Sequence, residues 1–426
     1  MLYVRVLEPL LEALRERCAS LPDRRVGMNS QYTMKDIGMA AFSVFFMQNE
    51  SFLQHQKRIQ DGKGLSNCQT LFDISKIPTE NHIRQHLDGA SPGHFDPIFS
   101  QAIRAFIAED DIAAFRRLSG HVLIALDGTE YFQSYKVHCS NCSHRQRRNE
   151  EREYFHTFLG ATLVAPGHKH VVPLPPEFIT PQDGHDKQDC EPTAAKRWLS
   201  KHGQGYADLK PIYLGDDLYS KQPMCEAVIA NGGKFIFVCK PDSHKTISEY
   251  LRGASISEHT ELIRKGKKTY THCYRWLCDL PLRDSPDALI VNWMQMDILD
   301  EKGKVTYRNS WITNLPIQRS NVVELAACGR TRWKIENETF NVLKNHGYNM
   351  EHNFGHGKQT LSAVLVALNL LAFAFHTLCE FIEEAWRHAR TRLHSRRMFF
   401  EQMRAATYYF VFPTWDKLME GLFQPP

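Results

Sequence analysis

The sequence predicts an α/β fold with helical regions at both ends, and three observations indicate this class. Apolar residues recur three and four positions apart through residues 1–117, as they do on the buried faces of helices. From residue 121 onward, β-branched and aromatic runs alternate with helical patterns, which is typical of α/β proteins. After residue 325 the pattern returns to long helices. We therefore expect a mixed α/β core between two all-helical regions.

Composition sets the broad class of protein. With 426 residues the chain is long enough for about two or three domains. Apolar residues at 42% and charged residues at 23% are ordinary for a folded protein and exclude an extensively disordered one. The net charge of +4 permits a nucleic-acid partner without requiring one. The odd number of scattered cysteines, eleven, indicates reduced thiols, and the N-terminus lacks a signal-peptide pattern, so we expect a cytoplasmic protein.

Residues 1–118 are predicted to form a helical N-terminal domain that binds DNA. Helical periodicity covers residues 6–17, 35–48, 78–88 and 95–118. The third of these helices follows Thr79, a favourable N-cap residue, and carries His82, Arg84 and His86. It could enter a DNA major groove as a recognition helix, or it could pack within a helix bundle.

Residues 119–345 are predicted to form the α/β core. Three strands, a helix, a strand, a helix and a strand follow in that order at residues 121–132, 153–165, 170–179, 192–201, 209–217, 220–232 and 233–241. A β-rich insertion follows at about residues 255–315, and its last two strands meet at a turn that contains Gly303. The core is therefore expected to be interrupted by an additional group of strands.

Residues 346–426 are predicted to form a helical C-terminal region. Its apolar run at residues 362–381 is interrupted by Asn369, His376 and Glu380. The uninterrupted parts are much shorter than the roughly 20 residues that cross a bilayer. We therefore expect a buried helix and no membrane partner.

Three acidic residues stand where a site could form. Asp127 and Asp216 each end an apolar strand, at the edge of the sheet where open α/β folds bind ligands. Either aspartate alone could equally well start a turn. Glu336 shares one stripe of a predicted helix with Arg332, four residues before it. The two aspartates together with this glutamate favour a functional site over isolated turns.

These residues resemble the signature of the DDE transposases of bacterial insertion sequences. In one group of that family the signature is Tyr, two residues, Arg, three residues, Glu, six residues, Lys (YREK), and Arg332 and Glu336 keep its spacing. The signature Tyr falls at Gly329 and the Lys at Leu343, with Lys344 one place later. The resemblance implies a ribonuclease-H-like catalytic core with a β insertion between the second aspartate and the glutamate.

For two of the three acids, a neighbouring acid is an alternative candidate. Asp217 follows Asp216, but side chains alternate along a strand, and the family's pattern of Asp followed by Tyr three residues later matches Asp216 with Tyr219. Glu338 lies two residues beyond Glu336 and would point about 200° around a helix. The spacing from the signature Arg favours Glu336.

The resemblance implies a DNA transposase that cleaves strands at element ends and transfers them into target DNA. Asp127, Asp216 and Glu336 would be the catalytic residues and would hold two Mg²⁺ ions, with Mn²⁺ as a substitute. The partners would be terminal inverted repeats, target DNA and a second copy of the chain, in the nucleoid of a bacterial cytoplasm. The alternatives are a nuclease of the same fold without strand transfer and an inactive, transposase-derived DNA-binding protein.

Basic and aromatic residues are candidate DNA contacts. Arg332 and Lys344 would bind phosphates near the scissile bond. Trp333 could stack on a displaced base, which in related enzymes accompanies a hairpin intermediate, or it could pack in the core. Basic segments that could track a DNA backbone, or simply be solvated, occur at residues 145–148, 264–268 and 387–397.

A single CxxC motif is a candidate zinc site. Cys139 and Cys142 could hold Zn²⁺, with further ligands from His138, His144 or Cys190. No second CxxC or HxxxH pair lies at a finger-like spacing, so a loop of reduced thiols is the alternative.

Overall fold

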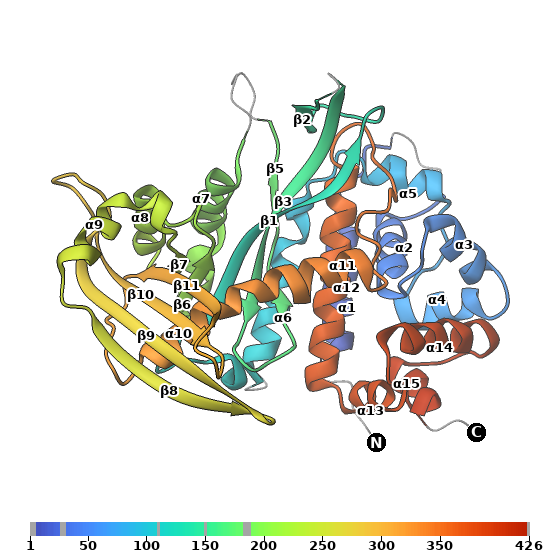
Figure 1. Cartoon of the computed structure of the whole chain (residues 1–426). Helices are drawn as coiled ribbons and strands as arrows, with labels where there is room; N and C mark the ends of the chain where they lie inside the picture. The colour runs from blue at the N-terminus through green and yellow to red at the C-terminus, as the bar shows by residue number, and fades with distance from the viewer. Residues whose placement is uncertain (1–5, 26–30, 109–110, 149–150, 182–188, 424–426) are drawn as a thin grey trace.

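The computed structural model describes residues 6–25, 31–108, 111–148, 151–181 and 189–423. Figure 1 shows a large twisted sheet on one side and a body of helices on the other, with the long helix α12 between them. Within the described residues, eleven strands form one mixed sheet. Its strands are β1 (Val122–Ser134), β2 (Ser143–Gln146), β3 (Arg152–Val164), β4 (Val172–Pro173), β5 (Glu177–Ile179), β6 (Pro211–Gly215), β7 (Lys234–Val238), β8 (Ser257–Lys265), β9 (Lys268–Pro281), β10 (Ile290–Leu299) and β11 (Val305–Thr313). A large mixed sheet with helices at both ends confirms the predicted α/β class.

The centre of the sheet is parallel. The strand order is β2-β3-β1-β6-β7-β11-β10-β9-β8, with β4 and β5 also paired to β3. β1, β6 and β7 run parallel, and β3 is antiparallel to β1. All five residues of β6 are buried, as expected for a strand covered on both faces. The crossovers are provided by α7 (Glu191–His202) and α8 (Gln222–Ala230), which the alternating sequence pattern predicted.

Strands fill the region predicted as a β insertion, and they extend the same sheet. β11 pairs antiparallel with β7, and β10, β9 and β8 follow outward from it. The sequence did not single out β8, whose burial pattern is largely exposed, nor the helix α9 (Lys245–Gly253) before it. The insertion therefore covers the edge that β7 would otherwise leave open.

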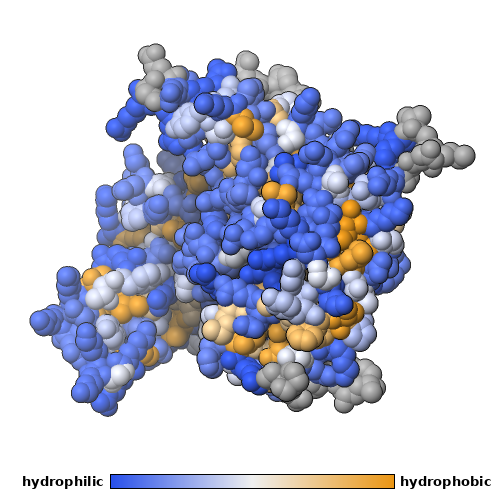
Figure 2. Space-filling model, turned by 90° about the vertical axis from the view of Figure 1, so that its right-hand side faces the viewer, coloured by the Kyte–Doolittle hydropathy of each residue, from blue (hydrophilic) through white to orange (hydrophobic). Residues whose placement is uncertain are grey.

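Helices from both ends of the chain pack into one body. The N-terminal helices are α1 (Leu7–Ala19), α2 (Met34–Phe46), α3 (Phe52–Gln60), α4 (Gly64–Phe72), α5 (Glu80–Leu87) and α6 (Asp96–Ala108), and the C-terminal ones are α12 (Leu361–Ile382), α13 (Glu384–Arg392), α14 (Arg396–Tyr409) and α15 (Trp415–Phe423). α2 packs on α12, and α4 packs on α14. The Asn67 side chain donates hydrogen bonds to the carbonyls of Thr407 and Phe410, both at 2.7 Å. In Figure 2 the outer face of this body is mostly hydrophilic, with separate apolar patches.

Several helices differ from the sequence prediction. α3 and α4 were not predicted, and the pattern at residues 95–118 divides into α6 and the short helix η2 (Asp111–Phe115), with residues 109–110 outside the described part. The pattern at residues 170–179 gives two very short strands, β4 and β5, because two prolines between them donate no ladder hydrogen bonds. These differences lie away from the strands that carry the acids.

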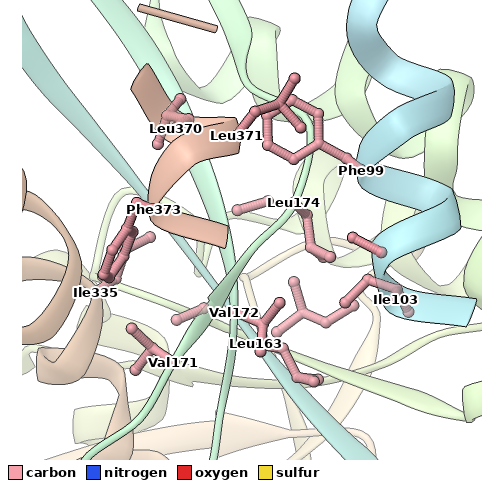
Figure 3. Packing of buried hydrophobic residues seen from close by; sticks show 14 of the residues in the cluster. Phe99, Ile103, Leu163, Val171, Val172, Leu174, Ile335, Leu370, Leu371 and Phe373 are labelled. Atoms are coloured by element: carbon pink, nitrogen blue, oxygen red, sulfur yellow. The ribbon is translucent and has the colours of Figure 1, made fainter. Parts of the chain in front are cut away.

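α12 joins the helical body to the sheet. This helix has the length and hydropathy of a membrane span, but 89% of its apolar window is buried inside the structure. It packs against α6 and β4. Figure 3 shows Phe99 of α6, Leu163 of β3, and Leu370 and Leu371 of α12 within one apolar cluster. The structure confirms the prediction of a buried helix.

The segment that carries Glu336 is not a simple α-helix. After α10 (Val322–Arg330) come a short 3-10 turn, η5 (Thr331–Trp333), a π-helical segment, η6 (Ile335–Phe340), and the short α11 (Asn341–Asn345). The single α-helical stripe predicted from the sequence is therefore wrong. π-helical turns occur often at functional sites because they shift side chains relative to the α-helical register.

Candidate active site

Asp127 and Asp216 lie on neighbouring parallel strands, Asp127 within β1 just past its parallel pairing with β6, and Asp216 directly after the last residue of β6. The prediction that Asp127 ends its strand is wrong, because β1 continues to Ser134 in antiparallel pairing with β3. β1 and β6 pair with Ala125 opposite Leu214. Continuing this register by two residues brings Asp127 level with Asp216, on strands that lie about 4.8 Å apart. Both side chains are partly buried, and the Asp216 carboxylate accepts the N–H of Leu218 at 2.8 Å. This edge of the sheet therefore carries two carboxylates on adjacent strands.

The π-helical segment brings Glu336 to the same edge. The segment packs on both β1 and β3. The ring of Phe340 lies over Gly160, the residue of β3 opposite Asp127. A Cβ atom on Gly160 would come within 2.7 Å of that ring. The absence of a side chain at Gly160 thus allows the segment that carries Glu336 to approach Asp127.

Arg332 links the acids of the two elements. Its guanidinium lies 2.7 Å from the carboxylate of Glu336 and 3.5 Å from that of Asp127. The sequence predicted that Arg332 and Glu336 share a face, and their side chains meet although the local helix is not α-helical. The two predicted acids therefore share one basic partner.

A fourth acid, Glu191 at the start of α7, was missed by the sequence analysis. Its carboxylate accepts hydrogen bonds from the buried hydroxyl of Tyr219 at 2.6 Å and from the N–H of Gly128. A Cβ atom on Gly128 would lie 2.3 Å from a Glu191 oxygen, so a side chain there would displace the Glu191 carboxylate. The available sequence signal, an acid followed by proline at a helix start, is common to many helices.

The acids shift one another's pKa values. Burial, together with the charges of Glu191, Glu336 and Asp216, raises the pKa of Asp127 to about 7, although Arg332 opposes the shift. Burial also raises the pKa of Glu191, and the charge of Asp216 adds to that effect. For Arg332, burial lowers the pKa, but the carboxylates of Glu336, Asp127 and Asp216 together outweigh it and the net shift is upward. Excess negative charge is therefore concentrated at this edge.

Asp217 and Glu338, the two alternative acids, interact with other residues. Asp217 accepts the N–H of Lys240 at 2.7 Å and the hydroxyl of Ser243. Glu338 lies near Lys334, whose pKa is lowered by burial against the opposing charge of Glu338, and near Arg396. Neither acid is among the main charges that shift the pKa of Asp127. The geometry therefore favours Asp216 and Glu336 as the members of the acidic cluster.

Packing accounts for the two departures from the family signature. At Gly329 a Cβ atom would come within 2.9 Å of the ring of Trp311, so the tyrosine of the signature does not fit. Leu343 is fully buried, and a lysine there would place its charge in the core. Lys344, the next residue, reaches the surface and pairs with Glu351 at 2.9 Å.

Trp333 is exposed to 42% of its full surface, so core packing does not account for it. Its ring lies 5.3 Å from the ammonium group of Lys334. A tryptophan directly after Arg332 is thus available to a ligand beside the acidic cluster.

Other predicted contacts are engaged within the chain. The guanidinium of Arg84, on the candidate recognition helix α5, donates to the carbonyl of Phe354 at 2.9 Å. Arg145, in the first basic segment, pairs with Glu130 and Glu153. These contacts favour helix-bundle packing for α5 and a structural role for Arg145.

The CxxC motif does not join the histidines that flank it. His138 and His144 are exposed, with His138 stacked on Tyr154, and Cys190 is exposed near Thr193. Two distant histidines approach the thiols instead, namely His156 of β3 and His356 of the loop before α12.

Four carboxylates at one edge of a sheet define a class of site that holds divalent cations. The model of the transposase DDE domain family matches residues 121–374, more than half of the chain, and the chain therefore belongs to this family. Membership makes the protein a transposase that acts on DNA with divalent metal ions. Comparison with curated proteins gives no significant match.

Proposed function

We propose that this protein is a DNA transposase that cleaves the ends of its own element and transfers them into target DNA. The observation that carries the proposal is the convergence of Asp127, Asp216 and Glu336 within a transposase DDE domain. A sheet with antiparallel β3 and β1 beside parallel β6 and β7 supports a ribonuclease-H-like core. The Arg332 and Glu336 spacing supports origin in a bacterial insertion sequence of the YREK group.

The three acids fit two Mg²⁺ ions, with Mn²⁺ as a substitute. Carboxylate oxygens are the hard ligands that Mg²⁺ prefers, and the raised pKa of Asp127 reflects burial together with nearby negative charge that divalent cations would offset. When bound, such ions activate a water or 3′-hydroxyl and stabilise the leaving oxygen. Asp127, within β1, and Asp216, directly after β6, would supply ligands from the sheet, and Glu336 would supply one from the segment packed on β1 and β3.

Residues beside the acids are proposed to bind DNA. Arg332 holds Asp127 and Glu336 in place, and its remaining N–H donors are proposed to contact a phosphate near the scissile bond. Trp333 offers an exposed ring for stacking on a displaced base. Lys344 makes a surface ion pair, which is weak and easily exchanged for a phosphate.

The rest of the chain is proposed to bring DNA and a second subunit to this site. Residues 1–118 would bind the terminal inverted repeats, residues 119–345 would catalyse, and the helical residues 346–426 would support pairing of two subunits on DNA. The proposed location is the bacterial cytoplasm, at the nucleoid.

The test is Mg²⁺-dependent cleavage and joining of a DNA that carries the element's own ends. Asp127→Asn, Asp216→Asn and Glu336→Gln each remove one carboxylate, and Asp217→Asn and Glu338→Gln are matched controls outside the cluster. We expect the first three to lose both activities by at least about 10³-fold, because residues that act as one unit fail together. The controls should retain both activities.

The products separate the alternatives. Cleaved DNA without joined products would identify a nuclease, and binding to the element ends without any cleavage would identify a DNA-binding protein. Equal loss of activity in Glu336→Gln and Glu338→Gln would contradict the assignment of Glu336.

A further inference from the structure

We infer that Cys139, Cys142, His156 and His356 bind one structural zinc ion. The candidate ligand atoms of these residues all lie within 4.8 Å of one another. Two sulfur and two imidazole ligands form a common structural zinc set. The cluster is separate from the acidic site, because His156 pairs with Phe132, five residues along β1 from Asp127.

The distances within the cluster match tetrahedral coordination. Zinc with sulfur ligands at about 2.3 Å and nitrogen ligands at about 2.0–2.1 Å holds sulfurs about 3.8 Å apart and sulfur about 3.6 Å from nitrogen. The two Sγ atoms here are 3.9 Å apart. Nε2 of His156 lies 3.6 Å from Sγ of Cys139 and 3.4 Å from Sγ of Cys142. Nε2 of His356 lies 3.6 Å from Sγ of Cys142.

The CxxC turn is shaped to present both sulfurs. The carbonyl of Cys139 accepts the N–H of Cys142 at 3.2 Å, which closes the turn. The N–H of Cys139 is directed at Sγ of Cys142, 3.4 Å away. Hydrogen bonds from outer groups orient metal ligands, and an N–H donor stabilises negative charge on a thiolate. The turn thus favours the deprotonated sulfur that zinc requires.

The cluster is mostly buried. Cys142, His156 and His356 are buried, and Cys139 is partly buried. The ring of Phe132 lies 4.3 Å from that of His356. Structural zinc sites have four protein ligands and little solvent access, whereas catalytic sites keep a position open. The geometry therefore points to a structural ion.

Zinc at this point would tie the sheet to the loop before α12. His156 belongs to β3, the cysteines form the turn between β1 and β2, and His356 lies in residues 346–360, which contain no helix or strand. That loop continues from α11, which directly follows the segment that carries Glu336. The ion would join the β1–β2 turn and β3 to the loop that follows the segment carrying Glu336.

Protein contacts already hold the C-terminal part of the loop. The Asp88 carboxylate accepts the N–H groups of Gln359, Thr360 and Leu361 at 3.0–3.1 Å. The side chain of Asn141, inside the CxxC motif, donates to the carbonyl of Gln359 at 2.8 Å. These contacts keep the loop and the CxxC turn together, so that His356 meets the thiols without large rearrangement.

The test is the metal content of the full-length protein purified under reducing conditions and then exposed to zinc and dialysed. We expect about one tightly held zinc per chain. Cys142→Ser and His356→Gln should each lower zinc affinity by at least about tenfold. Cys190→Ser and His138→Gln are matched controls, because these residues lie outside the cluster, and they should keep the ion.

A second measurement does not depend on how the variants fold. Cobalt added to the zinc-free wild-type protein should give the absorption of a tetrahedral site with charge transfer from two thiolates. Wild-type protein that takes up no stoichiometric zinc, iron in place of zinc, a Cys139–Cys142 disulfide under reducing conditions, or equal loss of zinc in His138→Gln would each overturn the inference. None of these results depends on DNA cleavage, so they leave the proposed function untouched.

Discussion

Asp127 lies close to carboxylates that other elements of the fold contribute. The carboxylates of Glu191, Glu336 and Asp216 act on it together, and Arg332 offsets them in part. Each contribution comes from a different element of the fold. At the scale of single residues, the site is therefore a balance of four acids against one guanidinium.

This balance predicts how metal binding depends on pH. Because the pKa of Asp127 is raised to about 7, the residue must lose a proton before it can hold a cation. We expect affinity for Mn²⁺ to rise about tenfold between about pH 6 and pH 8, measured by calorimetric titration. A flat profile would contradict the raised pKa of Asp127.

The same titration tests the role of Glu191. Glu191→Gln removes one negative charge but can still accept the hydrogen bond from Tyr219. The pKa of Asp127 should fall, and the rise in affinity should move to lower pH. Glu338→Gln, outside the cluster, should leave the profile of the wild type unchanged.

At the scale of elements, the close packing of α10 against the sheet excludes a side chain at Gly329. A Cβ atom there would lie 2.9 Å from the ring of Trp311 in β11 and 3.1 Å from Ile236 in β7. We expect Gly329→Ala to lower the free energy of unfolding by about 1–3 kcal/mol, because the helix must move away from the sheet. A tyrosine, which restores the family signature, should cost more. Chemical denaturation measures both.

Gly253 provides the matched control. It ends α9, and a Cβ atom there meets nothing within 4 Å. Gly253→Ala should leave stability unchanged or raise it by a few tenths to about 1 kcal/mol. If Gly329→Ala were as stable as Gly253→Ala, the approach of α10 would not be the constraint.

At the scale of the whole molecule, Glu380 of α12 connects the sheet to the C-terminal helices. Its carboxylate lies 3.2 Å from His170, before β4, 2.9 Å from Arg390 of α13 and 3.7 Å from Arg396 of α14. Burial alone would raise the pKa of Glu380, but the hydrogen bond with His170 and the charges of both arginines hold it well below its usual range. The ionised carboxylate is thus part of the native packing.

Removal of this charge should destabilise the whole fold. We expect Glu380→Gln to lower the free energy of unfolding at neutral pH by about 3–5 kcal/mol, because two arginines lose a buried partner. A lowered pKa in the folded state gives stability that is present above the ordinary carboxyl pKa near 4.5 and is lost as the pH falls below it. The difference in free energy of unfolding between Glu380→Gln and the wild type should therefore become smaller at acid pH.

An exposed pair serves as the control for that measurement. Glu401 pairs with Arg397 at 2.8 Å on the surface of α14. Glu401→Gln should change thermal unfolding little, since solvent screens exposed ion pairs. If Glu380→Gln and Glu401→Gln lowered stability equally, burial of Glu380 would not explain the loss.

The sequence by itself determined the fold class, most strands of the sheet and the position of Asp127 and Asp216 just after apolar runs. The apolar runs of β1 and β6, and the helical periodicity of α2 and α12, arise from neighbours within a few residues of one another. Asp216 directly follows the apolar strand β6, and Asp127 directly follows the apolar first half of β1, so their placement is also local. The predicted contact between Arg332 and Glu336 forms although the segment is not α-helical, because side chains four residues apart still meet there.

The tertiary structure alone decided which distant residues complete each cluster. Glu191 reaches Asp127 because α7 packs on β1, and His356 reaches the CxxC turn because the loop before α12 returns to β3. It also decided that the β insertion continues the central sheet, since the open edge of β7 pairs with β11. Such pairings depend on packing free energy between segments far apart in the chain, which leaves no periodic pattern in the sequence.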